Sequence, residues 1–325
     1  MNAQTATAVA QVRFRTGADW IAKHRLGPLL GFIIIFIALS VMSRSFLTVS
    51  NLLNVALQTS VNALLAIGST YVILTAGIDL SIGSVLAFSS AVAAGLMVSG
   101  TNPWWAALIG LLVGGLAGLL NGLFIAYARL APFIVTLGTL TLFRGLTQIY
   151  TAGTPIFNLP SGFANFGAGA IAGIPIPVIM TLIIFAIGAL ALSRTTHGRR
   201  IYAIGGNERA AHLAGIPVKR YLVAVYVISD VLAALAGLVL TSRLGTAEPT
   251  AGTGYELDAI TAVVLGGTSL FGGEGSLWGT LVGALILGVI GNGLNLLNIN
   301  AFYQDAIKGA IILLAIMLDR KRTAH

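Results

Sequence analysis

The amino-acid sequence predicts an all-α polytopic membrane protein, and three observations lead to this fold class. Of the 325 residues, 57% are hydrophobic and only 9% are charged, whereas a soluble domain carries about 25% charged residues. Apolar runs of roughly 20 residues, the length that a helix needs to cross a bilayer, recur along the whole chain. The 40 glycines follow no G-X-Y period. The composition therefore excludes a soluble domain, a collagen-like fibre and a disordered chain.

Apolar runs separated by polar breaks, or by breaks containing Gly and Pro, define about ten predicted transmembrane helices. We interpret the first as an uncleaved anchor, because a secreted remainder would not be this hydrophobic. The helices are expected at 28–43, 55–75, 82–99, 104–126, 133–150, 176–192, 222–242, 257–271, 277–297 and 303–318. They form a predicted transmembrane domain at 28–318, with an N-terminal tail at 1–27 and a C-terminal tail at 319–325.

The distribution of basic residues predicts the orientation of the chain. With about ten crossings both tails lie on one side, and most of the 18 Lys and Arg residues fall on that side. Cytoplasmic segments carry the excess of Lys and Arg, so both termini are predicted to be cytoplasmic. This distribution explains the net charge of +8 without a nucleic-acid partner. The two long connections are a cytoplasmic loop at 193–221 and an external loop at 151–175, which contains no Lys or Arg.

Two stripes of glycine predict close helix packing. Gly110, Gly114, Gly118 and Gly122 recur every fourth residue, so they share one helix face against which another backbone can approach. A second stripe begins at Gly275 and continues at Gly279 and Gly283. The glycines do not indicate a nucleotide site, because no G-x-x-x-x-G-K-[ST] sequence occurs.

Catalytic and metal chemistry finds no support in the sequence. The chain has no cysteine, and its four histidines have no paired-ligand spacing. We therefore expect neither an enzyme nor a metal site, and no cofactor in this chain.

Ionisable residues at membrane depth are costly and face a protein interior or a water-filled path. Asp230 lies near the middle of the seventh predicted helix. It either lines a path, as a polar or proton-coupling group, or pairs with a buried base such as Arg144 or Lys308. Asp79 precedes the third helix, where its carboxylate or the Ser81 hydroxyl is placed to cap the helix. The alternative is a broken helix aimed at a translocation path.

Amide side chains occupy several of the predicted helices. Such neutral groups suit a hydroxyl-rich solute better than an ion, although they serve equally well as helix-to-helix hydrogen bonds. The candidates for lining a path are Gln58, Asn62, Asn121, Asn292 and Asn295.

The cytoplasmic loop contains a predicted short helix. Asn207 is placed to cap it, and Gly215 followed by Pro217 is placed to end it. A helix this short is not stable alone, so we expect it to dock onto another protein, the alternative being an ordinary solvated loop. The residues expected at this contact are Asn207, Glu208, Arg209, Ala210, Ala211, Leu213 and Gly215.

Three ordered motifs carry a family resemblance. They are Gly77–Ser84 (GIDLSIGS), Ala203–Glu208 with Ala214–Ile216, and Pro249–Ile260 with Val264–Ser269. Together they resemble the permease subunits of bacterial ABC importers for monosaccharides such as ribose, xylose, arabinose and galactosides, and the ribose members most of all. The similarity runs from about Ser43 to Asp319.

The resemblance implies a type II-like ABC importer permease in the bacterial cytoplasmic (inner) membrane, surrounded by lipid. It implies a homodimer that forms the translocation path, a separate cytoplasmic ATPase that holds ATP and Mg, and an external (periplasmic) sugar-binding protein. The helix from Asn207 to Gly215 would then be the coupling helix. The segment Gly252–Asp258 is expected at the external mouth, where Tyr255, Glu256 and Asp258 are candidates for gating or for contact with the binding protein.

Other functions remain open from the residues alone. An ion-coupled secondary transporter would use Asp230 to carry a proton. Within ABC importers, the solute could instead be a nucleoside, an autoinducer sugar or a branched-chain amino acid. A membrane scaffold or an intramembrane enzyme is a further class, which would show no solute flux.

Overall fold

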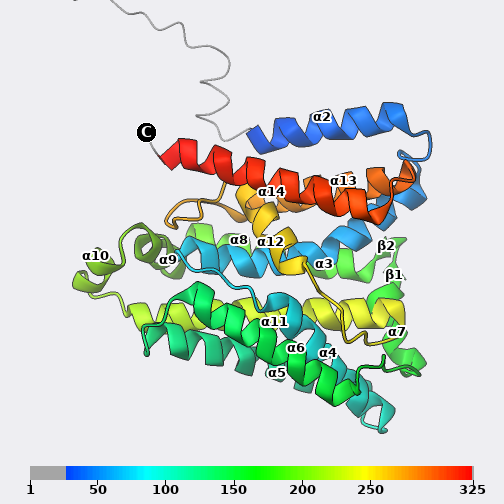
Figure 1. Cartoon of the computed structure of the whole chain (residues 1–325), viewed down its shortest axis with the longest axis horizontal. Helices are drawn as coiled ribbons and strands as arrows, with labels where there is room; N and C mark the ends of the chain where they lie inside the picture. The colour runs from blue at the N-terminus through cyan, green and yellow to red at the C-terminus, as the bar shows by residue number, and fades with distance from the viewer. Residues whose placement is uncertain (1–26, 324–325) are drawn as a thin grey trace, which may run out of the picture.

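The computed structural model describes residues 27–323, which form a bundle of roughly parallel and antiparallel helices with one two-stranded sheet (Figure 1). The predicted N-terminal tail therefore falls outside the described residues, except for its last position. The helices are α2 (Gly27–Met42), α3 (Val49–Leu74), α4 (Ile82–Val98), α5 (Pro103–Ala126), α6 (Pro132–Thr151), α7 (Ser161–Ala168), α8 (Ile176–Arg194), α9 (Thr196–Gly206), α10 (Glu208–Leu213), α11 (Val218–Leu244), α12 (Tyr255–Leu265), α13 (Leu277–Leu296) and α14 (Ala301–Thr323).

Every predicted transmembrane helix overlaps a helix of the structure. Five helices, α3, α5, α8, α11 and α13, are long and apolar enough to cross a membrane, and α2 and α4 are shorter apolar helices. The expected external loop contains α7 and an antiparallel pair, β1 (Ala170–Ile171) and β2 (Ile174–Pro175). The expected cytoplasmic loop contains α9 and α10. The fold is therefore all-α, with small additions in the two long connections.

Some boundaries differ from the predicted ones for local reasons. The helix α3 begins six residues earlier than predicted, because the Thr48 side chain caps it by accepting a hydrogen bond from the Asn51 backbone. The helix α12 ends at Leu265 rather than 271, and Gly267 just beyond it has a φ of +84°, a conformation that stops helices. The helix α14 continues to Thr323, so the residues expected to start a C-terminal tail remain helical.

The centre of the bundle is built by α3 and α11. The buried residues of α11 pack against α5, α3 and α4, and the glycine stripe of α5 makes the closest approach. A Cβ atom at Gly118 or Gly122 would overlap the α11 backbone at Tyr226 or Val223. The predicted packing role of this stripe is thus confirmed. The second stripe does the same for α13 and α12, because Gly279 leaves no space beside Gly266.

Two helices, α4 and α12, each follow a non-helical segment that leads into the bundle; we call them the discontinuous helices. The non-helical segment 75–81 leads from the end of α3 to α4, and the segment 245–254 leads from the end of α11 to α12. The two segments come from opposite ends of the bundle, the first from the end with α9 and α10 and the second from the end with α7 (Figure 1). The first turn of α4 meets the segment that precedes α12, where Gly83 and Gly252 pack backbone to backbone without room for a Cβ on either.

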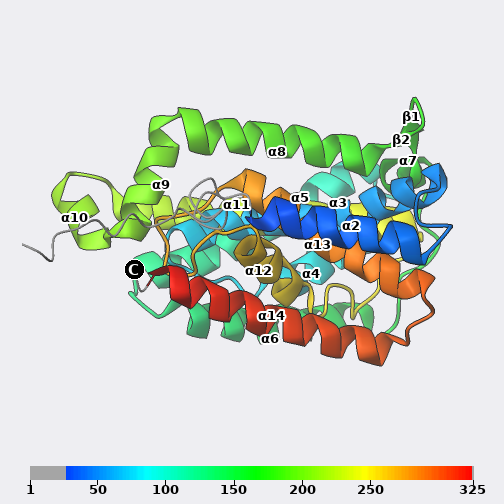
Figure 2. The same cartoon turned by 90° about the horizontal axis from the view of Figure 1, so that it is seen from above.

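Both described ends of the chain point the same way. The start of α2 and the end of α14 lie toward the end of the bundle that carries α9 and α10 (Figure 1). Figure 2 shows that α14 and α6 lie together on one side of the bundle, while α8 lies on the opposite side.

Candidate functional site

Four predicted path residues meet in a buried hydrogen-bond network. The Asp79 carboxylate accepts hydrogen bonds from the Ser81 backbone N–H (3.0 Å) and Ser81 Oγ (2.6 Å) through Oδ1, and from Ser229 Oγ (3.0 Å) through Oδ2. Asn121 Nδ2 donates to Asp230 Oδ2 at 3.1 Å and to Ser81 Oγ at 2.9 Å. The network ties the start of α4 to α5 and α11.

This network corrects two expectations. Asp230 pairs with Asn121 rather than with a base, because Arg144 and Lys308 have other partners, described below. The Ser81 hydroxyl makes no capping hydrogen bond to α4 and donates to Asp79 instead. The helix α4 therefore begins at buried residues directly after the contact between Asp79 and Ser81. Its aim at a translocation path stays a prediction.

The network is sealed in this conformation. Asp230 and Asn121 are 0% exposed and Asp79 is 2% exposed, and Thr139 on α6 completes the set by donating to Asn121 Oδ1 at 2.7 Å. A solute cannot touch these groups without rearrangement. Their hydrogen bonds instead fix the relative positions of α4, α5, α6 and α11.

Six other predicted residues line a second polar region. A pocket of about 210 Å³ lies between α3, α11, α12, α13 and α14. The predicted residues on its wall are Gln58, Asn62, Tyr255, Asp258, Asn292 and Asn295. Asn292 exchanges two hydrogen bonds with Asn51 (2.8 and 3.0 Å), so this amide joins α13 to α3. Gln304 Nε2 donates to Asn295 Oδ1 at 2.9 Å, which joins α14 to α13.

Several residues of this pocket were not predicted as path residues. Apart from Lys308, which was considered only as a partner for Asp230, the polar ones are Thr59, Arg243 and Gln304. Thr59 could have been found, because it lies beside Gln58 and three residues before Asn62, on the same side of a helix. The other two lie near helix ends, where sequence gives no indication of which way a side chain faces.

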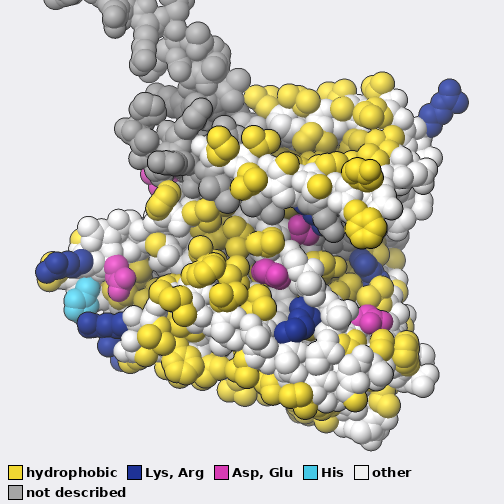
Figure 3. Space-filling model, viewed as in Figure 1, with side chains coloured by type: hydrophobic (Ala, Val, Ile, Leu, Met, Phe, Trp, Pro, Cys, Tyr) yellow, Lys and Arg dark blue, Asp and Glu magenta, His cyan; other side chains and the backbone are white. Residues whose placement is uncertain are grey.

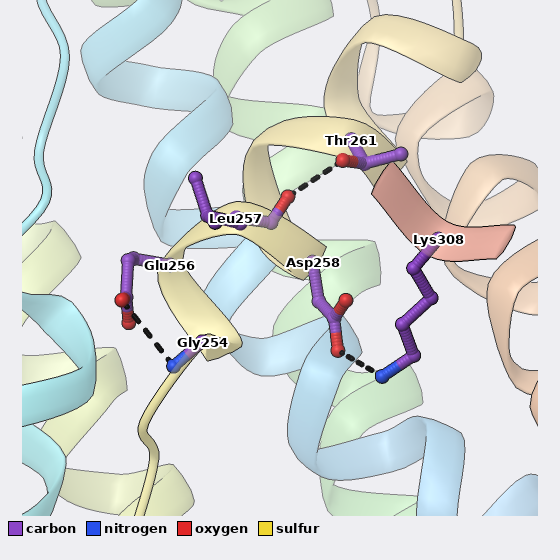
Figure 4. A network of polar contacts seen from close by, with 6 residues as sticks. All are labelled: Gly254, Glu256, Leu257, Asp258, Thr261 and Lys308. Carbon is purple, nitrogen blue, oxygen red and sulfur yellow. Dashed lines mark hydrogen bonds and ion pairs between the residues drawn. The ribbon is translucent and has the colours of Figure 1, made fainter. Parts of the chain in front are cut away.

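Two basic side chains from different helices hold the first turn of α12 and the segment just before it. Arg144 on α6 donates through Nη1 to the carbonyl oxygens of Pro249 (2.8 Å) and Ala251 (2.9 Å). Lys308 on α14 forms an ion pair with Asp258 at 3.2 Å, shown in Figure 4. Glu256 accepts from the Gly254 backbone N–H at 3.3 Å, in the same figure.

The segment Gly252–Asp258, expected at the external mouth, follows a turn-rich segment that leads from the α7 end of the bundle (Figure 1). Gly252 packs against Gly83 at the buried start of α4. Asp258 is buried, whereas Tyr255 and Glu256 are partly exposed. The position of this segment at an external mouth stays a prediction.

The predicted short helix of the cytoplasmic loop is confirmed as α10. The Asn207 side chain caps it by accepting a hydrogen bond from the Ala210 backbone N–H at 2.9 Å, and Gly215 follows it with a φ of +80°. Ala211 is buried, whereas Leu213 is 81% exposed. The helix thus presents an apolar side chain outward beside the charged residues Glu208 and Arg209.

The residues just before α10 contact both discontinuous regions. Gly205 packs against the carbonyl oxygen of Leu74, at the end of α3, and against the Gly273 backbone, in the loop that follows α12. Gly273 N–H in turn donates to Leu74 O at 3.0 Å. A Cβ at Gly205 would overlap these atoms, so the backbones at Leu74, Gly205 and Gly273 are closely packed against one another.

A larger cavity of about 1200 Å³ lies beside α10. It extends from Gly77, ahead of α4, to the start of α11, and its wall includes Arg129, Arg209, Lys219 and Arg220. Basic side chains at this end agree with the predicted cytoplasmic side.

A helical bundle with two discontinuous helices that meet inside it, polar groups around that meeting point and a capped surface helix at one end has the features of a membrane transport protein. The comparisons with known proteins specify the class. The family described as "Branched-chain amino acid transport system / permease component" matches residues 51–316, so the chain belongs to this permease family. It is a multi-pass permease of the cytoplasmic (inner) membrane, and as a permease subunit it is not an enzyme.

Individual relatives cover nearly the whole chain. The ribose import permease protein RbsC of Bacillus subtilis (strain 168) is 53% identical over 93% of this chain and 94% of the relative. RbsC of Escherichia coli (strain K12) is 45% identical over 98% of this chain and 99% of the relative. The D-allose transport system permease protein AlsC of the same strain is 45% identical over 89% of each chain. No solved structure matches this chain.

Proposed function

We propose that this chain is the permease subunit of an ATP-driven importer for ribose or a closely related monosaccharide. The names of its relatives support this solute class, since they are ribose and D-allose permeases at 45–53% identity. ATP and Mg would be held by a separate cytoplasmic ATPase, and an external sugar-binding protein would deliver the solute. No step of ATP hydrolysis is assigned to this chain.

The observation that carries the coupling mechanism is the close backbone packing at Gly205. A force applied to α10 by an ATPase reaches Gly205 through the N-cap residue Asn207, and from there reaches Leu74 and Gly273 by backbone contact. Leu74 precedes the segment that leads to α4, and Gly273 follows α12. Movement of α10 therefore acts on both discontinuous helices, as an energy-coupled change between two access states requires.

The external side has a matching contact. Ile156 in the external loop and Ala247 in the segment that leads to α12 exchange two backbone hydrogen bonds of 3.0 Å. A binding protein that docks on the loop at 151–175 would therefore displace the start of α12. This contact supports the external partner from the geometry of the chain itself.

A second copy of the chain is the proposed partner within the membrane. Figure 3 shows acidic and basic side chains in the middle of the face that carries α6, α12 and α14, between hydrophobic ones. A charge facing lipid at the centre of a helix costs about 2.5 to 3.5 kcal/mol. Covering this face with the same face of a second copy would enclose the charges around a translocation path. The proposed topology has about ten crossings with both termini cytoplasmic.

Reversing the charges on α10 tests the coupling. We expect the double variant Glu208→Lys with Arg209→Glu to abolish both uptake and sugar-stimulated ATP hydrolysis, because the contact with the ATPase would be lost. Membrane insertion should be unchanged, since both residues lie outside the predicted membrane-spanning helices. The measurements are pentose uptake and ATPase activity of the importer reconstituted in liposomes. Normal coupled ATPase activity in this variant would contradict the proposed role of α10.

The same liposomes separate this function from ion-coupled transport. Uptake that persists after collapse of the proton gradient and stops on ATP depletion supports the ABC importer. The reverse result would make Asp230 a candidate for proton coupling.

A further inference from the structure

The pocket beside α12 has the chemistry of a binding site as well as the shape of one. Its volume of about 210 Å³ exceeds that needed for a single water molecule. Its wall combines amide groups, including those of Gln58 and Asn62, with one aromatic ring, that of Tyr255. An amide both donates and accepts hydrogen bonds, and so does a hydroxyl group. The ring offers an apolar face for the carbon side of a small solute.

One hydroxyl on this wall lacks a partner. Thr59 is 4% exposed, and its Oγ1 makes no hydrogen bond to any of the described residues. Nearly all buried polar groups in proteins are hydrogen-bonded. Thr59 lines the pocket, and a rotation about its Cα–Cβ bond would present this hydroxyl to a molecule in that space.

The charges around the pocket disfavour a cation. Arg243 and Lys308 lie on the same wall as Asp258, and the ion pair between Lys308 and Asp258 balances one charge of each sign. A free cation would be repelled by Arg243. A polyhydroxylated molecule can instead hydrogen-bond to the Asp258 carboxylate, which is 9% exposed.

We infer that this pocket is a binding subsite for one small polyhydroxylated solute, of monosaccharide size, within the permease. Thr59, Asn62, Tyr255 and Asp258 supply its contacts. The solute would thereby touch the first turn of α12 directly, on the opposite side from the Arg144 contact. The inference rests on the proposed function, because it gives the imported sugar a defined binding site inside this chain.

The absence of cysteine from the sequence makes the subsite directly testable. Asn62→Cys places a single thiol on the pocket wall, and a water-soluble maleimide reports its accessibility in the reconstituted importer. We expect increasing D-ribose to slow this labelling several-fold, whereas a disaccharide at the same concentration should have no effect. Ser161→Cys, in the exposed start of α7, is the control and should be labelled at one rate throughout.

Two results would overturn the subsite. One is labelling that is equally fast with and without D-ribose in both Asn62→Cys and Gly291→Cys; Gly291 is a wall position that supplies none of the proposed contacts and has room for a side chain. The other is a thiol that is never labelled, since the pocket would then be closed to solutes. Failure of the unmodified importer to take up ribose on addition of ATP would be a different result, because it contradicts the proposed function itself.

A second variant checks the unpartnered hydroxyl without placing a reagent in the pocket. Thr59→Val keeps the side-chain volume and removes the hydroxyl, so uptake at limiting solute should fall about 2- to 10-fold, the loss of one hydrogen bond. Ser69→Ala is the matched control on α3. Its hydroxyl is also buried without a partner but lies away from the pocket wall. Equal uptake by both variants would remove Thr59 from the subsite.

Discussion

Asn121 shows what a single residue does in the interior of this permease. Its amide donates to Ser81 and Asp230 and accepts from Thr139. No other side chain type of this size offers donors and an acceptor in these directions. The residue therefore joins α4, α6 and α11 from its place on α5.

Asn121→Leu should destabilise the protein. The substitution keeps the branching of the side chain but leaves Asp230 Oδ2 without the Asn121 donor, a penalty of about 1–3 kcal/mol for a buried group. The Thr139 hydroxyl keeps the carbonyl oxygens of Val135 and Thr136 as acceptors. We expect a clearly lower midpoint of thermal unfolding in detergent. Asn54→Leu, at an exposed position on α3, is the control and should unfold at the temperature of the unmodified chain. An unchanged midpoint for Asn121→Leu would show that the network contributes nothing to stability.

At the scale of elements, one of the two discontinuous helices, α12, is held by side chains from two other helices. The helix α12 is held by Arg144 from α6 and by Lys308 from α14. Both bases act on the first turn or on the residues just before it, and the rest of α12 packs on α13 and α3. The start of α12 is thus the part of this helix that electrostatic contacts, rather than packing, keep in place.

Removing the Arg144 contact should loosen the segment before α12. In Arg144→Met, the carbonyl groups of Pro249 and Ala251 lose their donor, so amide hydrogen exchange over 246–257 should become faster. Thr141→Val on the same helix is the control, because its hydroxyl donates only within α6. Unchanged exchange in Arg144→Met would mean that packing alone holds the segment.

The sequence predicted the positions of the helices better than the contacts between them. Hydropathy placed a helix at each expected position, because the apolar length needed to cross a bilayer is a local property of the chain. It did not reveal that Asp79 and Asp230 belong to one network, since they are far apart in sequence and meet only through packing of α4 against α11. The contact between Gly83 and Gly252 was not predicted for the same reason.

At the scale of the whole molecule, the charged face of α6, α12 and α14 is the surface that lipid would least tolerate. The opposite side of the bundle carries α8 (Figure 2), whose exposed residues include Leu190 and Ile187. The two sides therefore differ in the environment that suits them. The first suits a second copy and the second suits lipid.

Cross-linking between copies tests this assignment. We expect Leu313→Cys on α14, a position 66% exposed, to yield covalent dimers with a short bifunctional thiol reagent in native membranes. Leu190→Cys on α8, 60% exposed, should remain monomeric. The readout is the mobility of the denatured protein on a gel. Dimers through α8 but not through α14 would place the partner copy on the other side.

The backbone contact between Gly83 and Gly252 has a mechanical consequence. Since neither residue leaves space for a side chain, the start of α4 and the segment that precedes α12 touch backbone to backbone, so a displacement of one is transmitted to the other. The segments that lead to this contact come from opposite ends of the bundle (Figure 1). A movement at either end is therefore felt at the other.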